Sequence, residues 1–271
     1  VPVPPLDARY RGAAQLAVFR GAWDDPRALW VGFKAGSNAV NHSHLDLGTF
    51  TLDADGVRWA VDLGRDDYNL PGYWERSEVT SRRWQYLRLN NHGHNTITPG
   101  ERLQDPHAVA PLLRFGSTPA RAFAVADLTP AYRGTAARLH RGLAMLDRAR
   151  VLVQDEATAL PAGMPLTWRL LTETTVRLDS ARVATLAQDG RRLRAEILAP
   201  AHARFETRPA KPRTAAENQN RGVTVLAVEI PGTAAADYFQ SSSGTIAGAA
   251  RAGHFSPTGV SSTARRTSLA A

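Results

Sequence analysis

Beyond Ala110 the chain is a succession of short apolar segments, and this rhythm restricts the fold more than any other feature. The segments read RAFAVADL, ARLHRGLAMLD, ARVLVQDEA, LTWRLL, TVRLD, RLRAEILAP and GVTVLAVEIPG. They recur about every ten residues with Gly, Pro, Asp or Asn between them, which is typical of an antiparallel β-sandwich. The stretch 135–150 is long enough for a helix, but Asp147 to Arg150 favours a hairpin turn within it.

The first 100 residues continue this pattern. Strands are predicted in AAQLAVFRGAW and from Ala28 to Gly36, and again from His94 to Thr98. The segments 48–53 and 57–63 form the clearest hairpin, because the Asp55–Gly56 step supplies the positive φ that a tight turn needs. We therefore predict an all-β fold, a large antiparallel β-supersandwich of two sheets. Residues 1–271 are expected to form one domain, with 1–12 as a lead-in and 256–271 as a frayed tail.

Composition excludes several classes of protein. With 43% hydrophobic residues the chain can bury a core, and no apolar run approaches the roughly 18 residues of a membrane span. It has no cysteine, so disulfides and thiolate metal sites are excluded. No nucleophile elbow, Walker loop or dinucleotide-binding motif follows a strand. The opening residues carry no initiating Met or signal segment, so the chain resembles a mature form or an excised piece.

The net charge of +8 comes almost wholly from arginine, since Lys34 and Lys211 are the only lysines. The guanidinium fork matches carboxylate and sulfate oxygens, so an acidic partner fits the charge. A GC-rich genome, which enriches Arg and Ala, explains the excess equally well. The basic residues are scattered and form no known nucleic-acid reader motif, so we expect no nucleic-acid partner.

Four residues form a candidate metal site. His42 and His44 make an H-x-H pair, Asp62 follows in the returning strand of the hairpin, and His94 ends a second H-x-H pair. In an extended chain the two imidazoles of such a pair point to one face. Two imidazoles and a carboxylate suit a divalent ion, most often zinc. Such histidines are also common as ordinary hydrogen-bonded residues, and spacing alone leaves both interpretations open.

The hairpin register conflicts with this site. If 53–56 is a four-residue turn, Asp62 faces Leu47 and not His44. A bulge or an early end of the strand is therefore needed to bring Asp62 to the histidines.

The segment 64–91 is irregular and rich in aromatic residues, and a loop of this length in a compact domain is usually functional. Its aromatic side chains are Tyr68, Tyr73, Trp74, Trp84 and Tyr86, interleaved with Arg65, Arg76, Arg82 and Arg83. Aromatic platforms beside cations suit sugar rings that carry carboxylates or sulfates. The alternative is that these rings simply pack on the sandwich.

The chain closely resembles the heparinase II/III-like family of polysaccharide lyases. The resemblance rests on GFKAGSNAVNHSHLDLGTFTLDADGVRWAVDLGRDDYNLPGYW, followed by RWQYLRLNNHGHNTI. It is dense from about Ala17 to Pro99 and continues weakly through LDRARVLVQDEA and LTWRLLTE. Members of this family join an N-terminal α/α-toroid to a β-supersandwich and act on uronate-containing polymers such as heparan sulfate or alginate. The resemblance covers the sandwich, so we expect the toroid to be absent from this chain.

The resemblance also implies roles for particular residues. It places the ligands of one structural zinc ion on His44, Asp62 and His94, and it prefers His94 to His92 because His94 directly precedes Asn-Thr. His42 and Tyr73 match catalytic residues of the cleft, and the implied reaction is β-elimination. The expected substrate-binding residues are Tyr68, Trp74, Arg76, Arg83 and His92. Family members work in the periplasm or outside the cell, which is the expected location here.

Two alternatives remain at this stage. A non-catalytic carbohydrate-binding module for acidic glycans would use the same aromatic and Arg residues. A cupin-like metal enzyme would use the H-x-H pair, but the nearest following carboxylate, Asp46, comes too early for that fold. We expect the toroid to supply the tyrosine that shuttles a proton and its Asn or His partner, so the isolated chain is expected to lack activity of its own.

Overall fold

A computed structural model describes residues 4–230 and 244–250. The expected tail at 256–271 lies outside the described residues. Short 3₁₀ turns are the helical structure within the described part: η1 (Arg82–Gln85), η2 (Leu87–Leu89), η3 (Asn91–Gly93) and η4 (Thr129–Tyr132). None of the helices described there is long and apolar enough to cross a membrane. The predicted all-β class is confirmed.

The strands of the described residues form three sheets, and each pairing among them is antiparallel. Sheet A has the order β1-β2-β3-β4-β5, with β7 paired to β3. Its strands are β1 (Ala8–Tyr10), β2 (Ala14–Arg20), β3 (Trp30–Ser37), β4 (Phe50–Ala54), β5 (Val57–Ala60) and β7 (Val109–Ala110).

Sheet C has eight strands in the order β13-β14-β15-β18-β11-β10-β9-β8. They are β8 (Leu112–Ser117), β9 (Arg121–Asp127), β10 (Arg138–Leu146), β11 (Arg150–Thr158), β13 (Thr175–Ser180), β14 (Val183–Gln188), β15 (Arg191–Ala199) and β18 (Gly244–Ala250). Sheet B has the order β16-β17-β12-β6. Its strands are β6 (Ile97–Pro99), β12 (Leu166–Thr172), β16 (Phe205–Pro209) and β17 (Thr224–Ile230).

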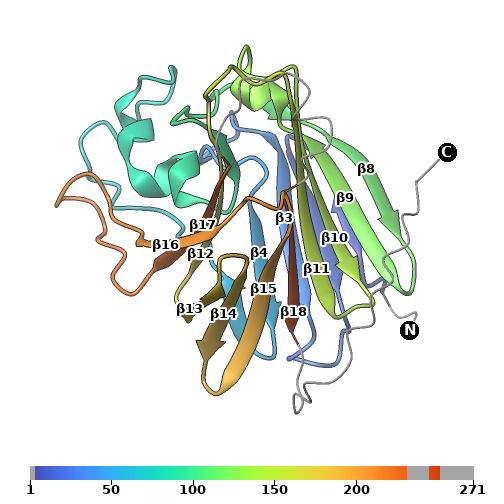
Figure 1. Cartoon of the computed structure of the whole chain (residues 1–271). Helices are drawn as coiled ribbons and strands as arrows, with labels where there is room; N and C mark the ends of the chain where they lie inside the picture. Colours follow the sequence, from blue (N-terminus) through green and yellow to red (C-terminus); the bar gives the residue numbers. More distant parts are fainter. Residues whose placement is uncertain (1–3, 231–243, 251–271) are drawn as a thin grey trace.

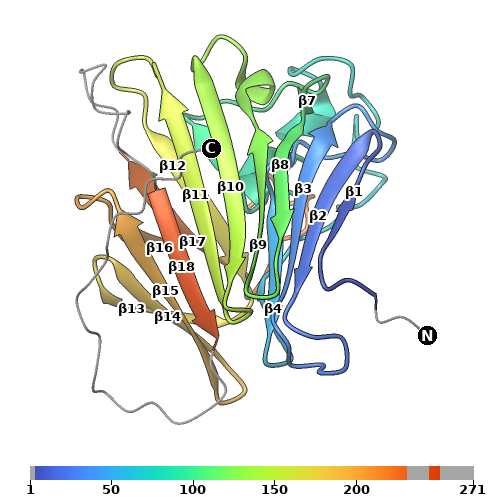
Figure 2. The ribbon, with the colours of Figure 1, turned by 90° about the vertical axis from the view of Figure 1, so that its right-hand side faces the viewer.

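Sheets A and C form the body of the sandwich. Figure 1 shows strands of sheet A behind strands of sheet C, and in Figure 2, turned by 90°, sheet C faces the viewer with β1 and β2 of sheet A beside it on the right. Alternate residues of β3, β10 and β11 are buried, as expected for strands that turn one face to a core. The predicted sandwich of two sheets is confirmed in its body, and sheet B extends it as a third, smaller sheet.

The hairpin of β4 and β5 departs from regular pairing at two points. The turn has positive φ at Asp55 and Gly56, as predicted from the Asp-Gly step. The register shifts between Leu52 and Asp53, and β5 ends at Ala60. Both the bulge and the early strand end that Asp62 requires are therefore present.

The predicted irregular segment lies beside the sandwich and contains η1, η2 and η3 (Figure 1). It has a small core of its own, separate from the core of the sandwich. The buried members of this core are Leu45, Leu70, Tyr73, Trp84, Tyr86 and Leu89. Because Leu45 belongs to the H-x-H segment, this core joins that segment to the aromatic one.

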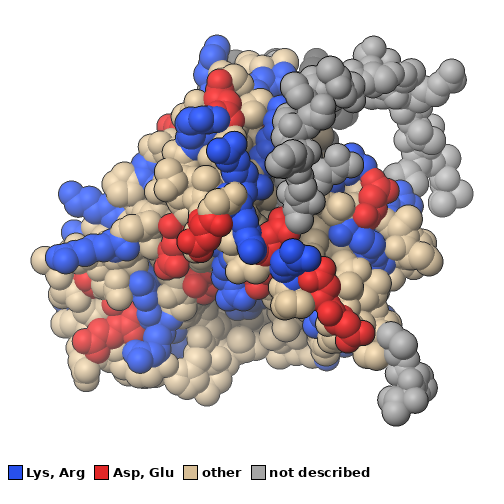
Figure 3. Space-filling model, turned by 90° about the horizontal axis from the view of Figure 1, so that it is seen from below, with Lys and Arg blue, Asp and Glu red and all other residues tan. Residues whose placement is uncertain are grey.

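Charged residues of both signs are mixed on the molecular surface. In the view of Figure 3, Lys and Arg side chains alternate with Asp and Glu across the face, with no continuous basic band. On this face the basic side chains are thus interspersed with acidic ones.

Candidate metal centre and sugar-binding residues

The H-x-H segment is a loop between β3 and β4. His42 has φ of 55° and is exposed, while Ser43 after it is buried. The imidazole of His42 lies edge-on to Trp74, with 5.4 Å between ring centroids. His44 instead faces His94, at 5.3 Å between ring centroids. The left-handed residue turns the chain, so the two imidazoles contact different rings although both line one cavity.

Buried polar side chains hold this loop in place. Gln104 is fully buried, accepts a hydrogen bond from Leu47 N at 3.0 Å and donates one to Leu47 O at 2.9 Å. It also accepts a hydrogen bond from Asn38 Nδ2 at 3.2 Å. Ser43 Oγ donates to Asn38 O. These bonds satisfy backbone groups that the loop would otherwise leave unpaired.

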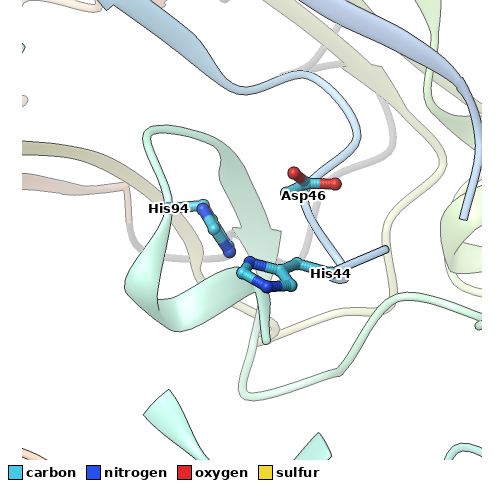
Figure 4. Close-up of side chains that lie close together, drawn as sticks. All are labelled: His44, Asp46 and His94. Carbon is cyan, nitrogen blue, oxygen red and sulfur yellow. The ribbon is translucent and has the colours of Figure 1, made fainter. Parts of the chain in front are cut away.

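His44 and His94 form the centre of a possible metal site. The ring of His94 is 1% exposed, and its Nε2 atom has no hydrogen-bond partner in the described part of the chain. Figure 4 shows this ring pointing toward the ring of His44. An unpaired nitrogen in a buried ring costs free energy unless a ligand accepts its lone pair. The pair is thus suited to a metal ion.

Two carboxylates lie near this pair. The ligand atoms of His44, Asp46 and His94 are all within 4.8 Å of one another, so these residues form a cluster that could hold an ion (Figure 4). Both oxygens of Asp46 already accept hydrogen bonds from Lys34 Nζ at 2.6 Å. Asp62 is not a member of this cluster but contacts His94, with its Oδ2 atom 3.0 Å from His94 Nδ1.

The contact between Asp62 and His94 is compatible with either of two roles. As a hydrogen bond, it would orient the imidazole and leave Nε2 free for a metal. Two donors of one tetrahedral zinc ion, each about 2.0–2.1 Å from it, lie roughly 3.3 Å apart, which is close to the observed distance. The site therefore fits zinc by its donor types with either carboxylate, and the predicted role of Asp62 stays a prediction.

The H-N-T segment owes its position to Asn95. This residue is fully buried, and its Nδ2 atom donates to Phe50 O at 2.7 Å and to Val61 O at 2.8 Å. Its Oδ1 atom accepts from Leu171 N at 2.6 Å. Because Val61 precedes Asp62, this single amide fixes His94 and Asp62 relative to each other.

Electrostatics favour the neutral form of one imidazole. Burial, together with the neighbouring His94, lowers the pKa of His44 to about 3. Burial alone would lower the pKa of His94, but the Asp62 carboxylate raises it above its ordinary value. Burial opposes ionisation of Asp62, yet the contact with His94 outweighs it and holds the pKa of Asp62 below its usual range. Neutral imidazole and ionised carboxylate are the forms that bind metals.

Four rings form an aromatic patch next to this cluster: His42, Tyr68, Tyr73 and Trp74. Tyr68 lies 5.2 Å from Trp74 and 5.1 Å from Tyr73 between ring centroids. Trp74 is 54% exposed and Tyr68 41%, whereas Tyr73 is 1% exposed. Burial raises the pKa of the Tyr73 hydroxyl above its ordinary value. Two broad aromatic faces are therefore available to a ligand, with Tyr73 beneath them.

Arg83 lies under the aromatic patch and not on the surface. Its side chain is 2% exposed, donates to Tyr73 O at 2.7 Å and to Ser43 O at 2.8 Å, and is 4.6 Å from the Tyr73 ring centroid. Burial lowers its pKa. The structure thus places this predicted substrate-binding residue where it joins the H-x-H loop to the aromatic segment.

The remaining predicted residues lie at the margin of the site. Arg76 is exposed and donates to Val40 O at 3.2 Å, so it lies next to the H-x-H loop. His92 is not part of the metal cluster, and its Nδ1 atom lies 3.3 Å from Glu101 Oε2. Burial lowers the pKa of His92 to about 4.

Some of these residues line a cavity of about 410 Å³. His42, His44, Asp46 and Asp62 all line it, together with residues of sheet A. Sequence reasoning had set Asp46 aside, although it continues the alternation of the H-x-H pair. It did not find Gln104 or Asn95, whose partners lie far away in the sequence.

Comparisons with known proteins assign the chain to a family. The model of the C-terminal region of heparinase II/III-like proteins matches residues 12–242. The chain belongs to the heparinase II/III-like family. A search of curated protein sequences finds no match.

Solved structures agree with this assignment at the level of the fold. A mutant of the heparan sulfate lyase HepC from Pedobacter heparinus matches with a TM-score of 0.71 and 16% identity, over 93% of this chain and 37% of that one. A heparinase III matches with a TM-score of 0.64 and 16% identity, over 86% of this chain and 35% of that one. The heparinase II/III-like chain therefore spans little more than a third of these lyases.

A different protein has this fold throughout its length. HI1317 matches with a TM-score of 0.54 and 6% identity, over 90% of this chain and 99% of that one. A sandwich of this kind therefore also occurs without a large additional domain.

Proposed function

We propose that this chain is the β-sandwich domain of a polysaccharide lyase that cleaves uronate-containing acidic polysaccharide by β-elimination. The observation that carries the proposal is the cavity in which His42 of the aromatic patch meets His44 and Asp62 of the metal cluster. Membership of the heparinase II/III-like family supports the reaction class. Heparan sulfate and alginate are the substrates that we consider first, and a periplasmic or secreted location suits both.

β-Elimination makes three demands on the site. The C5 carboxylate of the uronate must be neutralised, a base must remove the C5 proton, and an acid must protonate the leaving O4. His42 is exposed at the cavity, and an imidazole titrates close to neutral pH, so it can neutralise the carboxylate or accept the proton. The ring of Trp74 contacts both His42 and Tyr73, and the ring centroids of Tyr73 and Trp74 are 5.1 Å apart.

Other groups bind and position the polymer in this proposal. Trp74 and Tyr68 offer stacking faces for sugar rings, and Arg76 and His92 supply positive or polar groups at the margin of the site. Arg83 keeps the aromatic patch and the H-x-H loop in register. A second acid–base pair is expected from a preceding α/α-toroid domain.

The zinc ion has a structural role in this proposal. His44, Asp62 and His94 would hold it, and they come from three segments that the sequence separates widely. A bound ion would supply a fixed positive centre that keeps these segments together beside the cleft. In this proposal His42 and Tyr73, and not the zinc ion, act on the reacting sugar.

The test uses the protein together with its helical domain. We expect His42→Ala and Tyr73→Phe each to lower kcat by at least about 100-fold, because general acid–base groups contribute roughly 10²–10⁴-fold. The measurement is the ultraviolet absorbance of the unsaturated product from heparan sulfate or alginate. Matched controls are His140→Ala and Tyr10→Phe, which change a histidine paired with Asp127 and an exposed tyrosine of β1. Unchanged turnover in both site variants would exclude the assignment.

The second candidate is a carbohydrate-binding module without catalysis, which the exposed rings of Trp74 and Tyr68 also favour. It would bind acidic oligosaccharides with an affinity that falls as salt rises. It would yield no unsaturated product even when the helical domain is present.

A further inference from the structure

The outer face of sheet A contains a second set of residues suited to a sugar. Along β3, Val31 and Phe33 are buried in the core, whereas Trp30, Gly32 and Lys34 alternate with them and are partly exposed. These three residues therefore share the face that points away from sheet C. At roughly 3.3 Å per residue, the row from Trp30 to Lys34 is roughly 13 Å long.

The cavity runs from this row to the candidate active site. Its volume of about 410 Å³ falls within the range of small-molecule sites, roughly 300–1,000 Å³. The candidate site contributes His42, His44 and Asp62 to its lining. Sheet A contributes Leu16, Val18, Trp30, Gly32, Lys34 and Thr51, among others. The two sets of residues thus border one continuous space.

Gly32 determines how Trp30 lies in this space. A Cβ atom at residue 32 would be 2.7 Å from Trp30 Cη2 and 3.2 Å from Thr51 Oγ1. The indole therefore lies across Gly32, against the sheet, and any larger residue at that position would displace it. An indole held in this way presents a fixed flat surface at low cost in conformational entropy.

Two polar side chains line the same cavity as the indole. Thr51 offers a hydroxyl next to the ring, on the neighbouring strand β4. Lys34 Nζ gives hydrogen bonds to both oxygens of Asp46, and an ammonium group has three donors, so one remains for a ligand. Because Lys34 neutralises Asp46, the row does not present an unpaired anion to an acidic polymer.

We propose that this row is an additional subsite for the polysaccharide, in which Trp30 stacks on a sugar ring while Thr51 and Lys34 bind its polar groups. The inference rests on the proposed function and deepens it. In this proposal the sugar ring on Trp30 is a different ring of the polymer from the one at His42, so Trp30 touches no reacting atom. The subsite selects for chain length: an oligosaccharide long enough to span from His42 to Trp30 binds more tightly than a shorter one.

The experiment compares size-defined oligosaccharides of heparan sulfate and of alginate, from disaccharide to octasaccharide, on the protein with its helical domain. We expect Trp30→Ala to raise KM and Kd about 10-fold or more for the long oligosaccharides and to leave the shortest cleaved or bound one unchanged, with kcat preserved. Trp30→Phe should retain most of the affinity. Gly32→Ala should reproduce the loss with Trp30 intact, because its Cβ atom would displace the indole.

Trp23→Ala is the matched control. Trp23 is an exposed tryptophan whose Nε1 atom donates to Pro4 O at 2.9 Å, and it does not line the cavity. We expect this variant to behave as the wild type at every oligosaccharide length. Zinc content is measured in each variant to show that the metal cluster is intact.

The outcomes separate the subsite from the proposed function. An equal loss at all lengths, or a loss of zinc, would assign Trp30 a purely structural role and overturn the inference. Unchanged KM and Kd at all lengths would also overturn it and would point to the helical domain as the occupant of this face. A length-dependent loss of binding without any turnover would support the subsite while excluding the lyase. A wild type that neither binds nor cleaves any probe would overturn both proposals.

Discussion

Asp46 and Asp62 differ in what else they bind, and this difference is our ground for expecting Asp62 to be the third ligand of the proposed zinc site. Both oxygens of Asp46 accept hydrogen bonds from Lys34 at 2.6 Å, and its side chain is largely buried. Asp62 contacts His94 Nδ1 through one oxygen and accepts a hydrogen bond from Gly64 N at 2.8 Å through the other. Taking Asp46 as a ligand would weaken a close charge pair. Asp62 would instead share an ion with His94 through the Nδ1 side that it already contacts.

We therefore expect one zinc ion per chain in the wild type, lost in His44→Ala and in Asp62→Asn and retained in Asp46→Asn. The measurement is the metal content of the purified chain by inductively coupled plasma mass spectrometry, with circular dichroism to show that each variant is folded. His140→Ala serves as a control on β10 and should keep its zinc. Loss of zinc in Asp46→Asn with retention in Asp62→Asn would reverse the assignment, and a zinc-free wild type would remove the site.

At the scale of elements, one buried ion pair connects β10 and β11 to two of the three segments that carry the proposed ligands, those of His44 and His94. Arg141 donates through Nε and Nη2 to Asp155 at 2.6 and 2.8 Å. Its Nη1 atom donates to Gly48 O at 3.0 Å and to Asn95 O at 2.9 Å. Gly48 follows Asp46 closely and Asn95 follows His94 directly, so sheet C positions the metal cluster through one guanidinium group.

Arg141→Met should lower the free energy of unfolding by about 3–5 kcal/mol, because it leaves the Asp155 carboxylate buried and unpaired. The double variant Arg141→Met, Asp155→Leu should recover much of that stability but not the zinc affinity, since the carbonyls of Gly48 and Asn95 still lack their donor. Urea denaturation and competition with a zinc chelator measure the two quantities. Arg148→Met is the control: it breaks the Arg148–Asp7 pair and should lower the free energy of unfolding without changing the zinc affinity. Full recovery of zinc affinity in the double variant would contradict a positioning role.

The elements also show what local sequence can and cannot predict. The Asp-Gly turn between β4 and β5 and the alternation in β10 and β11 are local signals, and these hairpins form as predicted. β14 and β16 were not predicted, because VATLAQ is short and weakly apolar and FETRP ends in a proline. Local sequence also identified the metal-binding residue types. It indicated that a bulge or an early strand end was needed in this hairpin but not which of the two occurs, and it did not predict the bonds of Asn95, whose partners lie far away in the sequence.

At the scale of the whole molecule, the proposed catalytic groups are divided between this sandwich and a preceding helical domain. The chain covers 37% of a HepC lyase, whereas the sandwich of HI1317 occupies 99% of that chain, so a fold of this kind can exist by itself. We expect the isolated chain to unfold cooperatively, to bind zinc, and to bind acidic oligosaccharides with an affinity that falls as salt rises, because the contacts involve exposed charges.

Without the helical domain the same chain should give no measurable β-elimination, since His42 and Tyr73 satisfy only part of the demand for a base, an acid and carboxylate neutralisation. Adding the helical domain, joined in one chain, should restore formation of the unsaturated product. The comparison uses equal concentrations of the isolated and the joined protein, with His42→Ala of the joined protein as the inactive reference. Turnover by the isolated sandwich would mean that all the catalytic groups lie in these 271 residues. The acid that protonates the leaving O4 would then be a side chain of this chain, near the aromatic patch.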